Sequence, residues 1–242
     1  MVLRKWDDLP ADMRVPEVRR YYDILTERLV SLAVKRIFDV VASLVLLLLL
    51  ALPLLLIAIL IAIDSPGGVF YRQVRVTAYG KEFQIHKFRT MVANADRTGS
   101  ALTVWQDSRI TRIGRFLRKY RLDELPQLID VLAGNMSCVG ARPELPQYVH
   151  QYTNEMKATL LLPAGITSQA SILYKDEAEL LSTADDIDRV YVEQVLPGKM
   201  RLNLHAVEDF RLWNDIKVMA MTVFAVLGKV YVPDEGKEIV QH

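Results

Sequence analysis

Two adjacent carboxylates, Asp123 and Glu124, are the strongest candidates for chemistry in this chain. Neighbouring residues on a helix project about 100° apart, so the pair cannot share a proton as a side-by-side dyad. The two groups could instead divide the work, one as a nucleophile and the other as an oxygen ligand for magnesium. A structural interpretation stays open, in which Asp123 is the N-cap of a helix with Pro126 in its first turn. Helix N-termini also bind phosphate, so the two interpretations are compatible.

Basic residues are concentrated around this pair. The tightest group comprises Arg109, Arg112, Arg115, Arg118, Lys119 and Arg121. Arg142 precedes Pro143, which favours an extended backbone and projects the guanidinium from a stiff segment suited to bidentate phosphate contacts. Acidic residues gather later, within residues 176–188. This asymmetry suits a site for phosphates, an anionic lipid surface, or both.

Composition and missing motifs exclude several classes of protein. The 242 residues carry a net charge of +1, which does not indicate a nucleic-acid partner. The sequence contains no phosphate-loop, dinucleotide-binding, zinc-protease or serine-hydrolase motif. The single cysteine, Cys138, rules out an internal disulfide and fits a reducing compartment. We expect it to be a small buried residue.

An uncharged apolar run of 24 residues, 40–63, must place this chemistry at a membrane. A continuous helix of that length would rise about 36 Å, enough to span a hydrocarbon core of about 30 Å. Pro53 divides the run into arms of 13 and 10 residues, and neither arm spans alone. Basic residues flank both ends, so the charges give no clear orientation. From the run alone, a kinked spanning helix and a hairpin that returns to its own side both remain open.

Hydrophobic patterning predicts the other elements. Pro16 and Glu17 start an amphipathic helix that leads into the apolar run. Residues 69–76 and 82–87 alternate as two short strands, and residues 111–119 and 124–132 are predicted to be helices. Residues 210–230 present a broad apolar face, which fits either a helix on a membrane surface or a helix facing the core.

The order of several short motifs carries more information than any one of them. The motifs are Lys35-Arg-Ile-Phe-Asp39, the proline-broken run, Asp64-Ser-Pro-Gly-Gly-Val-Phe-Tyr-Arg-Gln73, Lys87-Phe-Arg-Thr-Met91, Asp107-Ser-Arg-Ile-Thr-Arg-Ile-Gly-Arg115, Leu122-Asp-Glu-Leu-Pro-Gln127 and Gly140-Ala-Arg-Pro-Glu144. In this order they resemble the bacterial sugar transferase family, the small monotopic phosphoglycosyl transferases. The resemblance extends from about residue 35 to residue 229.

The resemblance implies a reaction and roles for particular residues. Members transfer a sugar phosphate from a nucleotide sugar, usually a UDP-sugar, to undecaprenyl phosphate, in the first membrane step of exopolysaccharide, O-antigen, capsule or glycoprotein glycan assembly. Asp123 would form an aspartyl phosphosugar intermediate, and Glu124 would hold Mg²⁺. Lys87, Arg118 and Arg142 match positions that line the phosphate site.

The resemblance also implies an architecture. We expect a mainly α fold with a small antiparallel β element (α+β), in which a re-entrant membrane helix bends at Pro53 and the cytosolic catalytic domain carries membrane-surface amphipathic helices. The expected divisions are residues 1–34 for an N-terminal amphipathic segment, 35–66 for the membrane helix-break-helix and 67–242 for the catalytic domain. Because the donor nucleotide sugar is cytoplasmic, the monotopic protein should lie on the cytoplasmic face of the bacterial inner membrane. Leu52 stands where the family usually has serine.

Partners and alternatives complete the expectations. Undecaprenyl phosphate, a nucleotide sugar and membrane lipid are the expected partners, with a homodimer and downstream glycosyltransferases among the further ones and no nucleic acid. A non-catalytic, lipid-binding membrane adaptor is the competing hypothesis. A nucleotide-dependent kinase is disfavoured because kinase motifs are missing. The sequence does not identify the sugar.

Overall fold

The structure, a computed structural model, describes residues 3–93, 95, 107–175, 177, 181, 184 and 186–227. This part of the chain is mostly helical and includes one antiparallel and one parallel pair of strands. The α-helices are α1 (Pro16–Thr26), α2 (Leu29–Leu49), α3 (Ala51–Asp64), α4 (Arg112–Lys119), α5 (Gln127–Leu132), α6 (Pro146–Val149), α7 (Gln169–Leu173), α9 (Ile187–Val190), α10 (Leu196–Glu208) and α11 (Leu212–Val226). The strands are β1 (Phe70–Val76), β2 (Glu82–Phe88), β3 (Met136–Val139) and β4 (Ala164–Thr167).

Shorter turns connect these elements. The 3₁₀ turns are Trp6–Asp8, Ala11–Met13, Ala78–Gly80, Leu122–Glu124 and Met156–Leu161. A π-helical turn, Tyr191–Val195, joins α9 to α10. The prediction of a mainly α chain with an antiparallel element is confirmed, whereas the parallel pair is an addition that the sequence did not suggest.

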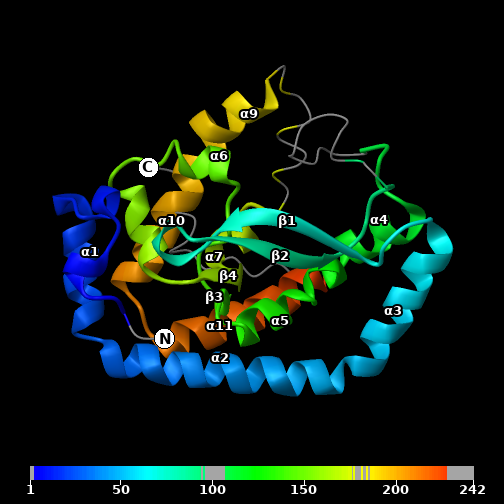
Figure 1. Cartoon of the computed structure of the whole chain (residues 1–242), viewed down its shortest axis with the longest axis horizontal. Helices are drawn as coiled ribbons and strands as arrows, with labels where there is room; N and C mark the ends of the chain where they lie inside the picture. Colours follow the sequence, from blue (N-terminus) through cyan, green and yellow to red (C-terminus); the bar gives the residue numbers. More distant parts are fainter. Residues whose placement is uncertain are drawn as a thin grey trace.

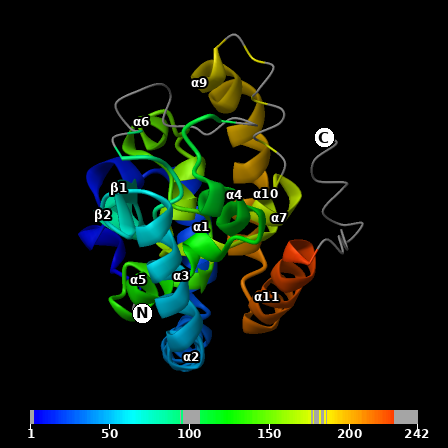
Figure 2. The ribbon, with the colours of Figure 1, turned by 90° about the vertical axis from the view of Figure 1, so that its right-hand side faces the viewer.

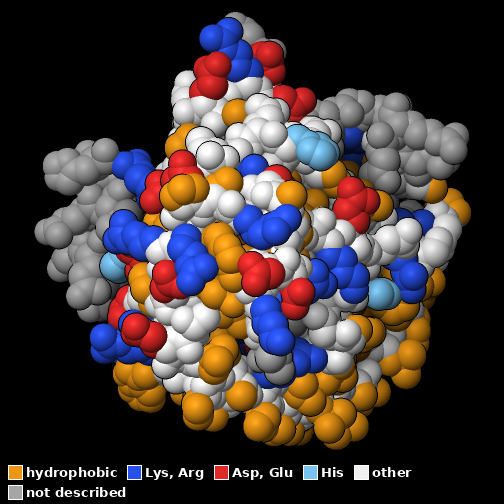
Figure 3. All heavy atoms as spheres, turned by 60° about the vertical axis from the view of Figure 1, so that its left-hand side comes forward, with side chains coloured by type: hydrophobic (Ala, Val, Ile, Leu, Met, Phe, Trp, Pro, Cys, Tyr) orange, Lys and Arg blue, Asp and Glu red, His pale blue; other side chains and the backbone are white. Residues whose placement is uncertain are grey.

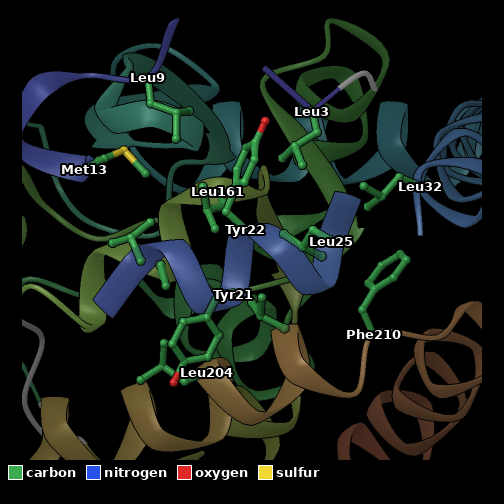
Figure 4. Close-up of a cluster of buried hydrophobic side chains, with 13 residues drawn as sticks. Leu3, Leu9, Met13, Tyr21, Tyr22, Leu25, Leu32, Leu161, Leu204 and Phe210 are labelled. Atoms are coloured by element: carbon green, nitrogen blue, oxygen red, sulfur yellow. The ribbon is translucent and has the colours of Figure 1, made fainter. Parts of the chain in front are cut away.

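Helix α1 begins at Pro16, as predicted, because proline fits the first turn of a helix. Its buried residues lie at helical spacing: Val18, Tyr21, Tyr22 and Leu25. They pack against the 3₁₀ turn Met156–Leu161 and against α10, and Figure 4 shows this cluster closing over Leu161, Leu204 and Phe210. The N-terminal segment therefore shares a core with residues from the far end of the chain.

The apolar run forms two helices, α2 and α3, which are bent by 63° at Leu50 (Figure 1). Pro53 lies in the first turn of α3 rather than at the bend itself, so the predicted position of the bend was three residues too late. The physical reason is that a proline ring clashes with the carbonyl four residues earlier, which here belongs to Leu49, the last residue of α2. No single described helix is long and apolar enough to cross a membrane, although α2 and α3 together meet that test of length and composition.

Large apolar side chains are exposed along one side of the molecule. They come from α2, where Ile37 is 65% exposed, from α3, where Ile63 is 78% exposed, and from α11, where Trp213 is 64% exposed. Figure 3 shows hydrophobic side chains gathered along the lower edge, the side that α2 occupies in Figure 1. A surface of this extent marks a binding face for lipid or protein.

Helix α11 lies beside α2 (Figure 2), and a buried ion pair joins them. Lys35 Nζ lies 2.5 Å from Asp215 and 3.6 Å from Asp39. Asp39 in turn accepts a hydrogen bond of 2.8 Å from Ser137 Oγ and one of 3.2 Å from the Cys138 amide. Cys138 is buried, as predicted, and burial raises the pKa of its thiol to about 11.

The core-facing interpretation of the last amphipathic segment is confirmed in part, and the membrane-surface interpretation stays a prediction. Val218 and Met219 of α11 pack on the core beside β3, while Trp213, Val223 and Phe224 are exposed. The predicted helix of residues 210–230 is observed as Leu212–Val226, and residues 228–230 lie outside the described part. One face of α11 is therefore a core face and the other contributes to the exposed apolar surface.

The strands carry the loops that hold the candidate site. β1 and β2 form the predicted hairpin, with Tyr71 opposite Lys87. β3 and β4 pair in parallel, and Gly140, the first residue after β3, approaches β4 so closely that a Cβ on Gly165 would lie 2.1 Å from the Gly140 amide nitrogen. Only glycine permits that approach. Residues 140–144 and 164–167 are consequently held side by side.

Candidate active site

Three elements converge on the Glu124 carboxylate. Lys87, near the end of β2, places Nζ 3.2 Å from Glu124 Oε1. Arg142, which follows β3, donates through Nη1 to Glu124 Oε2 at 2.8 Å and through Nη2 to Oε1, so that the pair is bidentate. Arg142 also donates to the Ile166 carbonyl in β4 at 3.3 Å. A planar guanidinium fixed on both sides in this way has a defined orientation.

The neighbouring carboxylate has a different environment. Asp123 is buried, yet no group among the described residues donates a hydrogen bond to its carboxylate. Burial and the charge of Glu124 raise the pKa of Asp123, and Lys87, Arg118 and Arg121 oppose that rise. Burial without a donor among the described residues disfavours the charged form of this carboxylate, in agreement with the direction of the pKa shift.

Glu124 is held as an anion. Burial alone would raise its pKa, but the guanidinium of Arg142 and the ammonium of Lys87 keep the pKa of Glu124 well below its ordinary value. Burial in turn lowers the pKa of Lys87, and Glu124 is the main charge that opposes this effect. The two adjacent carboxylates thus differ in pKa direction because only one has cationic partners in contact.

The two carboxylates come from one short turn of the backbone. Both lie in the 3₁₀ turn Leu122–Glu124, and Arg121 before it is in the left-handed region with a φ of 51°. A non-glycine residue there is strained, and such strain is typical of functional sites. The N-cap interpretation of Asp123 is wrong, because α5 begins only at Gln127 and Pro126 occupies its N-cap position.

The predicted cations are brought to the site to different degrees. Lys87 and Arg142 contact Glu124 directly. Arg118, in the last turn of α4, acts on Asp123 through its charge, and burial is the main cause that lowers the pKa of Arg118. Pro53 lies elsewhere, in the bent apolar helices.

The bent helices are nevertheless attached to this site. Arg89, just after β2, donates to the carbonyls of Ser65 and Pro66 at 2.6 and 2.7 Å. Asp64, at the end of α3, accepts a hydrogen bond of 3.0 Å from the Ile113 amide in α4. Ile61, Phe88 and Leu117 pack together between these elements. The end of α3 is therefore fixed to the same strand and helix that carry Lys87 and Arg118.

Supporting residues that the sequence did not single out hold the site from behind. Asp130 of α5 accepts hydrogen bonds from the His86 amide at 2.9 Å and lies 2.7 Å from its Nδ1, which fixes the strand next to Lys87. Arg75 donates to the Pro143 carbonyl at 3.1 Å. No local pattern indicates these contacts, since their sequence separations are 44 and 68 residues.

Glu124 is the candidate protein ligand for magnesium at this site. Among the residues described, no group of three or more His, Cys, Asp or Glu side chains could hold a metal ion. Magnesium commonly takes one or two protein carboxylates and completes its shell with water and substrate phosphates. Glu124 accepts three hydrogen bonds, which leaves about one of the four acceptor positions of a carboxylate. The donor chemistry fits a magnesium ion that binds together with phosphate.

Comparison with known proteins gave a consistent result. The family profile described as "Bacterial sugar transferase" matches residues 30–229. The chain is 32% identical over 197 residues to the UDP-N-acetylgalactosamine-undecaprenyl-phosphate N-acetylgalactosaminephosphotransferase of Aeromonas hydrophila, covering 80% of this chain and 44% of that protein. It is 38% identical over 196 residues to the undecaprenyl-phosphate glucose phosphotransferase of Komagataeibacter xylinus, covering 78% of this chain and 35% of the relative.

A third relative is covered more completely. The UDP-glucose:undecaprenyl-phosphate glucose-1-phosphate transferase of Caulobacter vibrioides is 34% identical over 196 residues, covering 80% of this chain and 69% of that protein. The chain therefore spans less than half the length of the first two relatives and about two thirds of the third.

Proposed function

Because this chain belongs to the bacterial sugar transferase family, we propose that it transfers a sugar phosphate from a UDP-sugar to undecaprenyl phosphate. The products are undecaprenyl-diphosphate sugar and uridine monophosphate. The relatives support this substrate class through their names, which specify N-acetylgalactosamine in one case and glucose in two. The sugar that this protein uses is not assigned.

The observation that carries the proposal is the unequal state of the two carboxylates. Asp123 has no hydrogen-bond donor among the described residues, whereas Glu124 is clamped by Arg142 and Lys87. A nucleophile needs free lone pairs for its attack. A carboxylate that orients neighbouring cations has its lone pairs engaged in hydrogen bonds with them. This inequality supports Asp123 as the nucleophile and Glu124 as the organising carboxylate.

The reaction proceeds in two displacements. An oxygen of ionised Asp123 attacks the β-phosphorus of the UDP-sugar, and the bond from this phosphorus to the bridging oxygen breaks. The electron pair leaves with uridine monophosphate, so no proton has to move. An oxygen of undecaprenyl phosphate then attacks the aspartyl phosphosugar and releases the Asp123 carboxylate. Two sequential displacements allow one pocket to receive a soluble donor and a lipid acceptor in turn.

The cations bind and orient the phosphates. Arg142 presents two parallel N–H groups that match a phosphate as well as a carboxylate. Lys87 contributes a compact positive charge from the end of β2, and Arg118 adds charge on the Asp123 side. Their combined positive charge stabilises the negative charge that develops on the leaving uridine monophosphate.

Magnesium is the proposed cofactor, with Glu124 as its protein ligand. When bound, the ion offsets the charge of the diphosphate and stabilises the leaving group. Glu124 retains acceptor capacity and the remaining ligands would come from phosphate and water, which is the usual pattern for this ion.

We place the protein at the cytoplasmic face of the bacterial inner membrane as a monotopic protein. The exposed apolar faces of α2, α3 and α11 would contact lipid, and the pair α2–α3 would enter and leave on one side. The 63° bend supports a hairpin, and the attachment of α3 to the site would hold Asp123 near the depth of a lipid phosphate. Residues 35–66 would be this hairpin, 1–34 the helical segment before it and 67–242 the catalytic domain.

Membrane lipid, a second copy of the chain and downstream glycosyltransferases remain proposed partners. The product would start exopolysaccharide, O-antigen, capsule or glycoprotein glycan assembly. A non-catalytic lipid-binding adaptor is the competing function, and the exposed apolar surface alone would serve either.

The first experiment uses the full chain in nanodiscs with undecaprenyl phosphate, Mg²⁺ and a panel that includes UDP-glucose and UDP-N-acetylgalactosamine. We expect one donor to release uridine monophosphate rapidly, and the Asp123→Asn variant to release essentially none. With donor alone, intact-mass spectrometry should detect a phosphosugar adduct on Asp123. Full biological effect of Asp123→Asn without any nucleotide release would favour the adaptor, and strictly ternary kinetics would refute the two-step route.

A further inference from the structure

A second charged cluster lies behind Arg142 and is not used by the proposed reaction. Its members are Glu144, Glu177, Tyr191 and Lys199. Lys199 is in α10 and its side chain is only 7% exposed, so its amino group lies inside the protein. It lies 3.5 Å from Glu144 Oε1 and 3.1 Å from Glu177 Oε2, and it donates to Tyr191 Oη at 3.0 Å.

Within this cluster, Tyr191 and Lys199 both contact Glu144. Tyr191 Oη donates to Glu144 Oε1 at 2.6 Å, and the Glu144 side chain is 7% exposed. Burial opposes its charge, but Lys199 and the Tyr191 hydroxyl keep the pKa of Glu144 low. Glu144 follows Arg142 by two residues, so these contacts fix the segment that carries the phosphate-binding guanidinium.

The π-helical turn Tyr191–Val195 allows both Tyr191 and Lys199 to contact Glu144. Tyr191 and Lys199 are eight residues apart, and on a regular helix they would point about 80° away from each other. The turn Tyr191–Val195 contains the wider i→i+5 bonding, which adds about one residue and brings the two side chains back to one face. Such single turns occur frequently at functional sites.

Glu177 differs from the rest of the cluster because it reaches the surface. Its side chain is 33% exposed, against 7% for both Glu144 and Lys199. Its position is fixed by the Lys199 contact and by its amide, which donates to the Tyr174 carbonyl at 3.2 Å. Tyr174 packs over Gly198, where a Cβ would lie 1.9 Å from the hydroxyl. Two adjacent residues of α10, Gly198 and Lys199, therefore contact the segment that contains Tyr174 and Glu177.

Glu177 is connected to the segment that carries Arg142 through Lys199, which contacts both Glu177 and Glu144. Burial opposes the charge of Arg142, but Glu124 and, to a lesser extent, Glu177 raise the pKa of Arg142. A partly exposed carboxylate beside a phosphate-binding arginine would repel phosphate, so it is poorly suited to bind that group. A carboxylate is instead a strong acceptor for hydroxyl groups, and in a UDP-sugar those groups stand next to the β-phosphate.

We propose that Glu177 accepts hydrogen bonds from the sugar hydroxyls of the donor and contributes to donor selection, with Lys199 as its positioning residue. This inference rests on the proposed function, since it needs a nucleotide sugar in the site. Lys199 donates to one oxygen of Glu177, and a carboxylate has about four acceptor positions, so acceptor capacity remains for a ligand. Loss of a charged hydrogen bond of this kind typically weakens binding about tenfold or more.

The test compares two ligands that differ only by the sugar. UDP and the UDP-sugar that the wild type turns over fastest are titrated against the full chain in nanodiscs, in an Asp123→Asn background that prevents turnover. Glu177→Gln should weaken binding of the UDP-sugar about tenfold and leave the UDP affinity within twofold. Lys199→Met removes the contacts with both Glu177 and Glu144, so it should weaken the binding of both ligands, and Lys199→Arg should restore most of the affinity.

A matched control is Glu193→Gln, which makes the same chemical change at an exposed glutamate paired with Arg189 at 3.0 Å. It should alter neither affinity. Equal weakening of UDP and UDP-sugar by Glu177→Gln, or no weakening of either, would overturn the inference while leaving the proposed function intact. Absence of nucleotide release by the wild type with every donor would refute the proposed function and this inference together.

Discussion

At the scale of single residues, the central feature is the clamp of Arg142 and Lys87 on Glu124, next to Asp123, whose carboxylate accepts no hydrogen bond from the residues that the structure describes. We expect Arg142→Lys to lower kcat/KM for uridine monophosphate release at least 100-fold. Lysine keeps the charge but cannot form the bidentate contact with carboxylate or phosphate. Arg189→Lys, at an exposed ion pair, is the matched control and should stay within twofold of wild type. Equal activity of the two variants would show that Arg142 does not bind phosphate in the reaction.

The raised pKa of Asp123 predicts the acidic limb of the pH profile. A protonated carboxyl cannot attack phosphorus, so kcat/KM should fall as the pH decreases through a pKa above the ordinary 3.8. Arg118 is one of the cations that lower this pKa, so Arg118→Met should move the acidic limb to still higher pH. The profile is measured with saturating undecaprenyl phosphate, and Arg189→Met should leave it unchanged. A limb at or below 3.8 would contradict Asp123 as the buried nucleophile.

At the scale of elements, α2 and α11 are joined by the buried pair of Lys35 and Asp215. Lys35→Met leaves the buried Asp39 and the largely buried Asp215 without their cation, so we expect a loss of about 3 kcal/mol in the free energy of unfolding. Denaturant titration in micelles measures it. Arg189→Met removes an exposed pair and should cost less than about 1 kcal/mol. Similar losses for the two variants would show that the α2–α11 pair is not effectively buried.

Elements with strong local signals could be predicted from the sequence, and those set by distant contacts could not. Alternation of apolar residues was sufficient for β1 and β2, and Pro16 for the start of α1. The strands β3 and β4 have four residues each and pair over a long loop, so no periodicity identifies them. Asp123 was recognised as a chemical group, but its backbone was predicted wrongly because Pro126 delays α5 and a left-handed Arg121 intervenes. Lys199 and Glu177 lie 22 residues apart and meet only in the folded protein.

At the scale of the whole molecule, the proposed hairpin makes a topological prediction. In a Cys138→Ser background, Ser31→Cys and Gly68→Cys should both react with a membrane-impermeant maleimide from the cytoplasmic side of inverted vesicles. Gly68 is suitable because a Cβ there meets only a carbonyl oxygen at 3.8 Å. Neither cysteine should react in intact spheroplasts. Labelling of one of the two positions from each side would establish a crossing and exclude the hairpin.

The π-helical turn also bears on how this chain tolerates changes in length. Deleting one residue from an ordinary helix rotates everything after it by about 100°, which would turn Lys199 away from its partners. Deletion within Tyr191–Val195 would convert the wide turn to a regular one and bring Tyr191 and Lys199 to a spacing of seven positions, which again places them on one face. Among homologues, single-residue gaps should therefore accumulate at this turn and be rare along the rest of α10.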